Sequence, residues 1–202
     1  MAEQRYIDVL RHGEPEGGRC IRGQRDDRLS AAGWAQMRAA VAHGRLWQRV
    51  VSSPLHRCAD FASAYAKAHQ LPLCIEPRLK EIGFGPWEGH KPAKLQRDDP
   101  ERYTRFRRDP VAHLPPGAEP VTAFAARVGA AWDELLLQSD ARAVLVVAHA
   151  GVIRALLNHV LGAPAHCLFR SQVGYACFTR FVVDSGGLVR LVCHNVARLP
   201  ET

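Results

Sequence analysis

The chain has 202 residues, of which 47% are hydrophobic and 23% are charged. This is the composition of an ordinary globular protein, and it excludes a disordered chain, a fibre and a disulfide-rich miniprotein. The formal net charge is +7, and all but four of the 27 basic residues are arginines. The protein is therefore expected to attract anions, and arginine suits bidentate recognition of phosphate, although a GC-rich genome would also produce such a composition.

Apolar segments and cysteines bear on the cellular location. The apolar stretch near the N-terminus is too short for a signal peptide, and no run approaches the ~20 apolar residues of a membrane span. A cytoplasmic protein without membrane contact is therefore expected. The six cysteines are scattered and form no C-x-x-C motif, so they give no support to a zinc or thioredoxin-type site and are expected to be reduced.

The first half of the chain alternates strand-like and helix-like segments. A mostly apolar segment at 6–10 predicts a strand. Ser30 predicts the N-cap of a helix whose apolar residues recur at helical spacing. A second strand is predicted at 49–52. It is followed by a helix over about 54–69, whose first turn tolerates a proline.

The second half continues this alternation. A helix is predicted at 120–138, and the apolar run at 143–148 is typical of a strand that is buried on both faces of a parallel sheet. Another helix is expected from 151 to 161. Two further strands, at 175–183 and 187–193, are joined by a hairpin-like turn. The pattern predicts an α/β fold, a three-layer α/β/α sandwich with a mostly parallel central sheet.

Histidines and arginines follow the predicted strands. Arg11 and His12 end the first strand, Arg57 lies shortly after the second, and His149 directly follows the buried strand. Ligands of open α/β sheets bind beyond the carboxyl ends of the strands, so these side chains are expected to meet at one crevice. The helix that begins near Gly151 would add backbone N–H groups and the positive end of its dipole, which suit an anion.

This set of side chains suits phosphoryl transfer. Arginines can bind the phosphoryl group, one neutral imidazole can attack phosphorus, and a second, protonated imidazole can stabilise the oxygens. The leaving alcohol needs a proton, and Glu81 is the candidate donor. It lies in the glycine-rich loop 81–89, where Phe84 and Trp87 can raise the pKa of a carboxyl group. Glu88 is an alternative donor in the same loop. Each of these residues, taken alone, is more simply explained by a structural role. The hypothesis of phosphoryl transfer therefore rests on their shared position at the ends of predicted strands.

Other chemistries lack their motifs in this sequence. There is no G-x-x-x-x-G-K-[ST] loop for nucleotide phosphates and no G-x-S-x-G elbow of an α/β-hydrolase. No cysteine is followed by arginine at the sixth position, as a cysteine-based phosphatase would require. No aspartate cluster supports magnesium, so neither a metal nor another cofactor is expected.

Several segments, in their order and spacing, resemble the histidine phosphatase superfamily, which is also called the phosphoglycerate mutase-like family. The matching segments are Leu10-Arg11-His12-Gly13-Glu14, 23–33, 51–59, 81–89, 116–119 and 148–154. The resemblance implies that His12 is the phosphorylated nucleophile and that Arg11, Arg57 and His149 form the phosphate pocket. It also implies that Glu81 is the proton donor and then the base for the attacking water, without a metal.

Within this superfamily, the length and the 79–89 loop are most similar to a small bacterial branch. That branch contains α-ribazole-5′-phosphate phosphatases of cobalamin synthesis and broad-specificity phosphatases. The resemblance implies that substrate contacts come from Arg11 and Arg57 together with Arg22, Gly23, Gln24 and Ala150. Gly18 stands where an asparagine often contacts phosphate, and Arg22 or Gln24 is expected to compensate. The other departures from the family pattern are Pro15, Ala118, Ala150 and Pro120.

Charge and proline concentrate at about 91–117, where arginines alternate with acidic residues. We expect a single domain over 1–202 with this segment as a lid insertion. A solvated helix with internal ion pairs is the simpler interpretation. In the functional interpretation the segment covers the non-phosphate part of the substrate, and Tyr103 and Phe106 pack against a ring.

The sequence therefore predicts a metal-independent phosphomonoester hydrolase that forms phosphohistidine, with α-ribazole 5′-phosphate as the favoured substrate. A mutase of the same fold would return the phosphoryl group to an intermediate instead of water. A third alternative is a module that only binds phospholigands or nucleic acid. It would need arginines but no carboxyl group positioned to donate a proton. The expected partner is a small phosphorylated metabolite rather than nucleic acid. The oligomeric state stays open, with a homodimer as one option.

Overall fold

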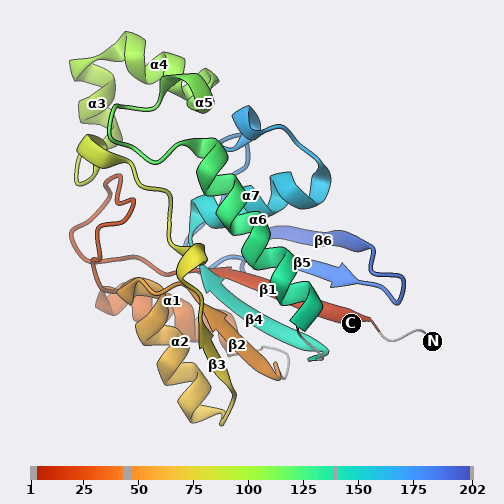
Figure 1. The fold of residues 1–202 in the computed structure, drawn as a ribbon. Helices are drawn as coiled ribbons and strands as arrows, with labels where there is room; N and C mark the ends of the chain where they lie inside the picture. The colour runs from red at the N-terminus through yellow and green to blue at the C-terminus, as the bar shows by residue number, and fades with distance from the viewer. Residues whose placement is uncertain (1–3, 43–46, 139–140, 201–202) are drawn as a thin grey trace.

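The structure is a computed structural model that describes residues 4–42, 47–138 and 141–200. Its described strands form one six-stranded sheet in the order β3-β2-β4-β1-β5-β6 (Figure 1). The strands β3, β2, β4 and β1 run parallel to one another, whereas β5 is antiparallel to both β1 and β6. The strands are β1 (Arg5–Arg11), β2 (Arg49–Ser52), β3 (Leu73–Ile75), β4 (Ala143–Ala148), β5 (Phe178–Val183) and β6 (Val189–Val196).

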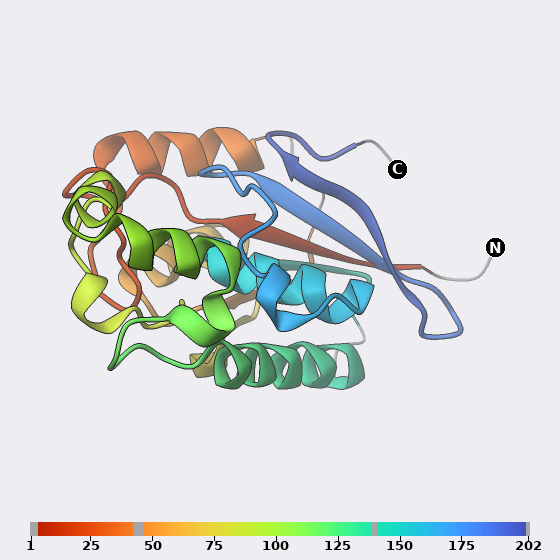
Figure 2. The same cartoon turned by 90° about the horizontal axis from the view of Figure 1, so that it is seen from above.

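Helices cover both faces of this sheet (Figures 1 and 2). Helices α1 and α2 lie on one face, and α6 and α7 lie on the other. The α-helices are α1 (Ala31–Val41), α2 (His56–Ala68), α3 (Pro92–Asp98), α4 (Pro100–Arg108), α5 (Pro110–His113), α6 (Val121–Gln138) and α7 (Ala150–Leu161). Short 3-10 helices are η1 (Pro77–Leu79), η2 (Gly85–Trp87) and η3 (Ala165–Cys167). The predicted α/β/α sandwich with a mostly parallel sheet is confirmed.

The alternation of side chains along the central strands creates a core on each face. Val144 and Val146 of β4 pack in the cluster that includes residues of α6 and α7. Leu145 and Val147, which point the opposite way, pack in the cluster that includes Met37 of α1 and residues of α2. Every residue of β4 is therefore buried, as the apolar run 143–148 predicts.

Local signals place most of the element boundaries correctly. The side chain of Ser30 accepts a hydrogen bond from the backbone N–H of Gly33 at 3.0 Å, so it is the predicted N-cap of α1. The hairpin strands β5 and β6 begin two or three residues later than predicted. The sequence analysis missed β3, because this three-residue strand is only partly buried and depends on pairing with β2.

The segment between η2 and α6 contains the short helices α3, α4 and α5, which lie beyond the carboxyl ends of the parallel strands (Figure 1). Each helix begins with a proline, and Asp99 and Asp109 cap α4 and α5. Exposed ion pairs within α3 and α4, such as Arg105 with Glu101, agree with the simpler, solvated interpretation. Phe106 is nevertheless buried against Trp87, with ring centroids 4.9 Å apart.

A buried ion pair joins β1 to β5. Arg180 is 1% exposed and donates two hydrogen bonds to Asp8, which is fully buried, at 2.7 and 3.0 Å. The indole N–H of Trp47 donates to the same carboxylate at 2.8 Å. Removing one partner of such a pair leaves an uncompensated buried charge.

We therefore expect Arg180→Met to lower the free energy of unfolding by about 3–5 kcal/mol. Urea unfolding followed by circular dichroism measures this loss. The double variant Asp8→Leu/Arg180→Met, which buries no charge, is the control and should recover much of the stability. An equally large loss in the double variant would show that packing rather than charge accounts for the effect.

Candidate active site

The parallel strands β1 and β4 place His12 and His149 at the same edge of the sheet. Strand β4 lies between β1 and β2, and the pairing continues past the strand ends. The backbone N–H of His12 donates to the carbonyl of Ala148 at 3.0 Å, and that of Ser53 donates to Val147 at 3.0 Å. The imidazole rings of His12 and His149 consequently lie with centroids 5.3 Å apart. The structure thus brings together side chains that are 137 positions apart in the sequence.

The imidazole of His12 is oriented by its own neighbour. Its Nδ1 lies 2.7 Å from the carbonyl oxygen of Gly13, which can only accept, so Nδ1 carries the proton and Nε2 keeps a free lone pair. A side chain at Gly13 would place its Cβ 2.3 Å from the carbonyl oxygen of Gly33, so this turn requires glycine. Burial, and then the charges of Arg11 and Arg57, lower the pKa of His12 well below its ordinary value. The imidazole is therefore neutral at neutral pH, as a nucleophile must be.

Two arginines face this imidazole without carboxylate partners. Arg57 is 1% exposed and donates to the carbonyl oxygens of Arg25 at 2.6 Å and Gly23 at 2.7 Å. Arg11 donates to the carbonyl of Val173 at 2.6 Å. The Nε atoms of both arginines are buried and have no hydrogen-bond partner among the described residues. Buried, unpaired N–H groups on two cations form a site that a dianionic phosphoryl group would satisfy.

His149 completes the positively charged pocket. Its Nε2 lies 2.6 Å from the hydroxyl oxygen of Ser53, and the thiol of Cys58 lies 3.6 Å away from the same nitrogen. Burial, followed by the charge of Arg57, lowers the pKa of His149 well below its ordinary value. The free protein therefore holds a neutral imidazole here. A phosphoryl dianion bound beside this ring would raise the pKa and would favour the protonated form.

Glu81 lies at the N-terminus of α7. One carboxylate oxygen accepts from the backbone N–H of Gly151 at 3.0 Å, and the other accepts from that of Ile82 at 3.0 Å. A Cβ at position 151 would lie 2.1 Å from this carboxylate, so glycine is needed for the approach. The carboxylate of Glu81 is therefore held by the backbone N–H of the residue that lies two positions after His149 in the chain.

Glu88, the alternative donor, holds two loops together. A single carboxylate oxygen of Glu88 accepts from the backbone N–H groups of Gln24 and Phe84, both at 2.9 Å. A Cβ at Gly23 would lie 2.0 Å from that oxygen. These contacts give Glu88 a structural role in joining the two loops.

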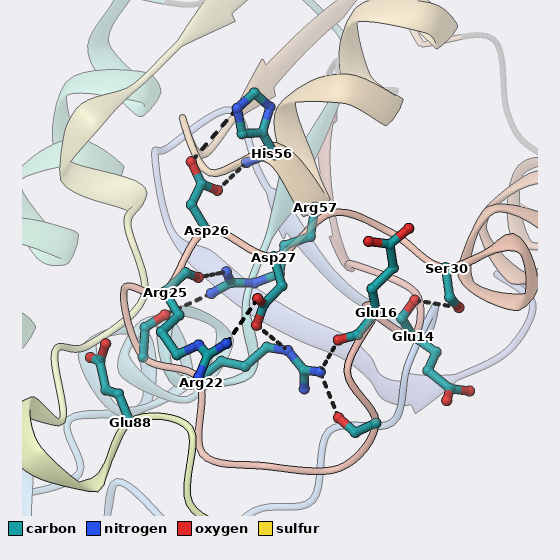
Figure 3. A network of polar contacts seen from close by, with 12 residues as sticks. Glu14, Glu16, Arg22, Arg25, Asp26, Asp27, Ser30, His56, Arg57 and Glu88 are labelled. Carbon is teal, nitrogen blue, oxygen red and sulfur yellow. Dashed lines mark hydrogen bonds and ion pairs between the residues drawn. The ribbon is translucent and has the colours of Figure 1, made fainter.

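The loop that precedes α1 is organised around Arg22 (Figure 3). Arg22 is buried, pairs with Asp27 at 3.1 Å, and donates to the carbonyl oxygens of Glu16 and Gly18. These contacts make Arg22 a support of the loop that carries Gly23 and Gln24. Gln24 donates from its side chain to the carbonyl of Glu81 at 3.2 Å, which links this loop to the candidate donor. Ala150, the remaining predicted contact, is buried at the first position of α7.

Two neighbours of the predicted catalytic residues are absent from the set predicted from sequence. Tyr175 lies under the guanidinium of Arg11, whose central carbon is 4.1 Å from the ring centroid, and its ring centroid is 5.8 Å from that of His12. Ser53 contacts His149 as described above. Ser53 could have been found, because it directly follows a predicted strand. Tyr175 comes from the opposite end of the chain, and no local signal marks it.

No group of three or more His, Cys, Asp and Glu side chains within 4–42, 47–138 and 141–200 is arranged to hold a metal ion. Over the same ranges, no helix has the length and apolar character needed to cross a membrane.

Comparisons with known proteins agree with this geometry. The family model of the histidine phosphatase superfamily (branch 1) matches residues 7–196. The adenosylcobalamin/alpha-ribazole phosphatase of Escherichia coli is 30% identical over 180 residues, which cover 87% of this chain and 89% of that protein. The solved structure of a mycobacterial glucosyl-3-phosphoglycerate phosphatase is 29% identical and has a TM-score of 0.83. That match covers 96% of this chain and 99% of that one.

The first curated relatives are longer proteins, and the chain spans about half of their length. One of them, a bifunctional protein of Mycobacterium tuberculosis, is 35% identical over 193 residues, which are 91% of this chain and 52% of the relative. The family match nevertheless extends over nearly all of this sequence. The chain therefore belongs to the histidine phosphatase superfamily.

We expect the imidazole of His12 to stay neutral in the ligand-free protein well below pH 6.5, the ordinary histidine pKa. The unfolded chain protonates His12 near that value, so it binds more protons than the folded protein just below it. The contribution of His12 to stability is therefore complete above pH 6.5 and is lost as the pH falls below it. An NMR titration of the ring proton, assigned by comparison with His12→Gln, tests this. A midpoint at or above 6.5 would contradict the buried, cation-flanked environment.

Proposed function

We propose that the chain is a metal-independent phosphomonoester hydrolase that forms a phosphohistidine at His12. The observation that carries the proposal is the set of orphaned, buried guanidinium N–H groups of Arg11 and Arg57 beside a neutral imidazole. Phosphate binding alone would use the arginines. The neutral nucleophile with an oriented tautomer, together with the carboxyl group of Glu81, supports turnover as well.

The first chemical step transfers the phosphoryl group to His12. The lone pair on Nε2 attacks phosphorus in line with the ester oxygen, the new P–N bond forms, and the P–O bond to the alcohol breaks. The departing oxygen takes a proton from Glu81. Arg11, Arg57 and a protonated His149 stabilise the charge on the phosphoryl oxygens during the transfer.

The second step returns the protein to its starting state. Glu81, now a carboxylate, accepts a proton from water, whose oxygen attacks phosphorus. The P–O bond to water forms as the P–N bond breaks, and the imidazole of His12 leaves as a neutral group. Inorganic phosphate and the protonated Glu81 are the products of this step, so the protons balance over the cycle.

We propose α-ribazole 5′-phosphate as the first substrate to test. One relative is named an adenosylcobalamin/alpha-ribazole phosphatase and another a glucosyl-3-phosphoglycerate phosphatase, so both compounds belong in the comparison. We further propose that the α3–α5 segment is a lid over the leaving group. Phe106 is packed within the protein against Trp87 and Phe169, which leaves the half-buried Tyr103 as the better candidate for contact with a ring.

Steady-state hydrolysis of a phosphomonoester panel in EDTA tests this proposal with wild type and His12→Ala side by side. The panel contains α-ribazole 5′-phosphate, glucosyl-3-phosphoglycerate, 3-phosphoglycerate, a nucleoside monophosphate and an aryl phosphate. We expect wild type to favour one metabolite and His12→Ala to lose at least ~10³-fold in kcat, because the nucleophile is removed. His56→Ala, which changes a partly exposed histidine paired with Asp60, is the matched control.

Two results would contradict the proposed hydrolase activity. Phosphoryl return to a sugar acid, stimulated by a bisphosphorylated primer, would identify a mutase. Binding of phospholigands without turnover, unaffected by His12→Ala, would identify a binding module.

A further inference from the structure

A guanidinium in helix α6 binds the main chain next to Glu81. Arg127 donates from one terminal nitrogen to the carbonyl oxygens of Arg78 at 2.5 Å and Lys80 at 2.7 Å. Its other terminal nitrogen donates to the carbonyl of Glu81 itself at 3.1 Å. A single side chain therefore fixes the backbone immediately before and at the candidate proton donor.

Glu119 fixes Arg127 and the backbone after Glu81. Its two carboxylate oxygens accept from Nε and a terminal nitrogen of Arg127 at 2.6 and 2.8 Å, which is a bidentate pair. The same carboxylate accepts from the backbone N–H of Gly83 at 3.1 Å, and the backbone N–H of Glu119 donates to the carbonyl of Gly83 at 2.8 Å. Both sides of Glu81 are thus held by one ion pair, which we name the Arg127–Glu119 clamp.

The clamp has features that a solvent-exposed ion pair lacks. The side chains of Arg127 and Glu119 are only 22% and 20% exposed, so the pair is largely shielded from water. The guanidinium also lies over the ring of Phe124, 4.8 Å from its centroid. Only the planar fork of arginine can serve a carboxylate and several carbonyl oxygens at once, because lysine offers a single charged centre.

The clamp also closes the base of the α3–α5 insertion. Gly83 and Glu119 flank the segment 84–118, which contains η2 and all of α3, α4 and α5. The paired backbone groups of Gly83 and Glu119 bring the two ends of this insertion together. Rearrangement of the helices beyond this point would therefore leave the backbone of Glu81 in place.

We propose that Arg127, held by Glu119, is a positioning residue that fixes Glu81 for proton transfer to the leaving group. The proposal rests on the function proposed above, because it assigns the clamp to the donor of that reaction. Misplacing a catalytic group by about 1 Å can cost on the order of 10²-fold in rate, so the clamp can matter for catalysis without touching the substrate.

The test compares two leaving groups in the phosphorylation step alone. An alkyl phosphate needs a proton from Glu81 as its alcohol departs, whereas 4-nitrophenyl phosphate releases a stable phenolate that needs none. Rapid-quench measurement of phosphoenzyme formation isolates this step from the later hydrolysis, which uses Glu81 as a base for both substrates. The measured quantity is the ratio of the alkyl rate to the aryl rate.

Glu81→Gln sets the reference, because it removes the transferable proton and should lower this ratio by about 10²-fold. We expect Arg127→Met to lower the ratio by about 10-fold or more. Arg127→Lys and Glu119→Gln should have smaller effects in the same direction. If Arg127→Met does not fold, these two milder variants carry the test.

Arg78→Met is the matched control. The side chain of Arg78 joins η1 to α6 through its ion pairs with Glu76 and Glu134. Its replacement weakens the contact between these two elements, but it leaves in place the backbone carbonyl groups that Arg127 binds. We expect it to leave the ratio within about twofold of wild type, since Glu81 keeps its geometry.

The outcomes separate the clamp from the proposed mechanism. Suppose that Glu81→Gln lowers the ratio of alkyl to aryl rates. If the Arg127 variants then behave like Arg78→Met, or slow both substrates equally, the positioning role of Arg127 is wrong, whereas Glu81 remains the proton donor. If Glu81→Gln itself leaves the ratio unchanged, Glu81 is not the donor, and the positioning role is wrong with it.

Discussion

The parallel pairing of β1 with β4 and of β4 with β2 is the constraint on which the site depends. Parallel strands end at the same edge of a sheet, so the residues that follow them become neighbours whatever their separation in the chain. The hydrogen bond from His12 to Ala148 continues this pairing by one residue, and it fixes the approach of His12 to His149. Nothing else in the sequence relates these two histidines.

Uncompensated positive charge is the second feature of this edge. Two other arginines that are shielded from water have carboxylate partners, Arg180 with Asp8 and Arg127 with Glu119. Arg11 and Arg57 bind only carbonyl oxygens and retain buried N–H groups without partners. Buried cationic groups without partners are costly and are typical of sites that bind anions. Burial, and then these positive charges, lower the pKa values of His12 and His149, so both imidazoles are neutral in the free protein.

Sequence patterns that involve only neighbouring residues made much of the fold predictable. Ser30 caps α1 through a residue three positions away, and the apolar run 143–148 needs no partner to reveal a buried strand. The histidines and arginines could be predicted to meet because strand ends are visible in sequence and parallel sheets align them. The family resemblance rests on the same segments, and the match over residues 7–196 confirms it.

Contacts between distant segments were beyond sequence reasoning. Glu81 is the donor predicted from sequence, and Glu88 in the same loop is the alternative. Their different hydrogen bonds, to Gly151 and to Gln24 and Phe84, are visible only in the folded chain. Arg22 stays a predicted substrate contact, and its pairing with Asp27 and its hydrogen bond to the carbonyl of Glu16 could not be predicted from sequence. The tie from Arg127 to Glu81 spans 46 positions and follows no periodicity, so only the folded chain shows it.

The central claim is a covalent phosphate on His12, and trapping that intermediate tests it most directly. Wild type would be mixed with a labelled phosphomonoester and quenched in base, which preserves phosphohistidine and destroys acyl phosphates, and the labelled peptide would then be sequenced by mass spectrometry. The account predicts an acid-labile label on the peptide that contains His12, and no label in His12→Gln. Turnover without any trapped label, or a label on another residue, would contradict it.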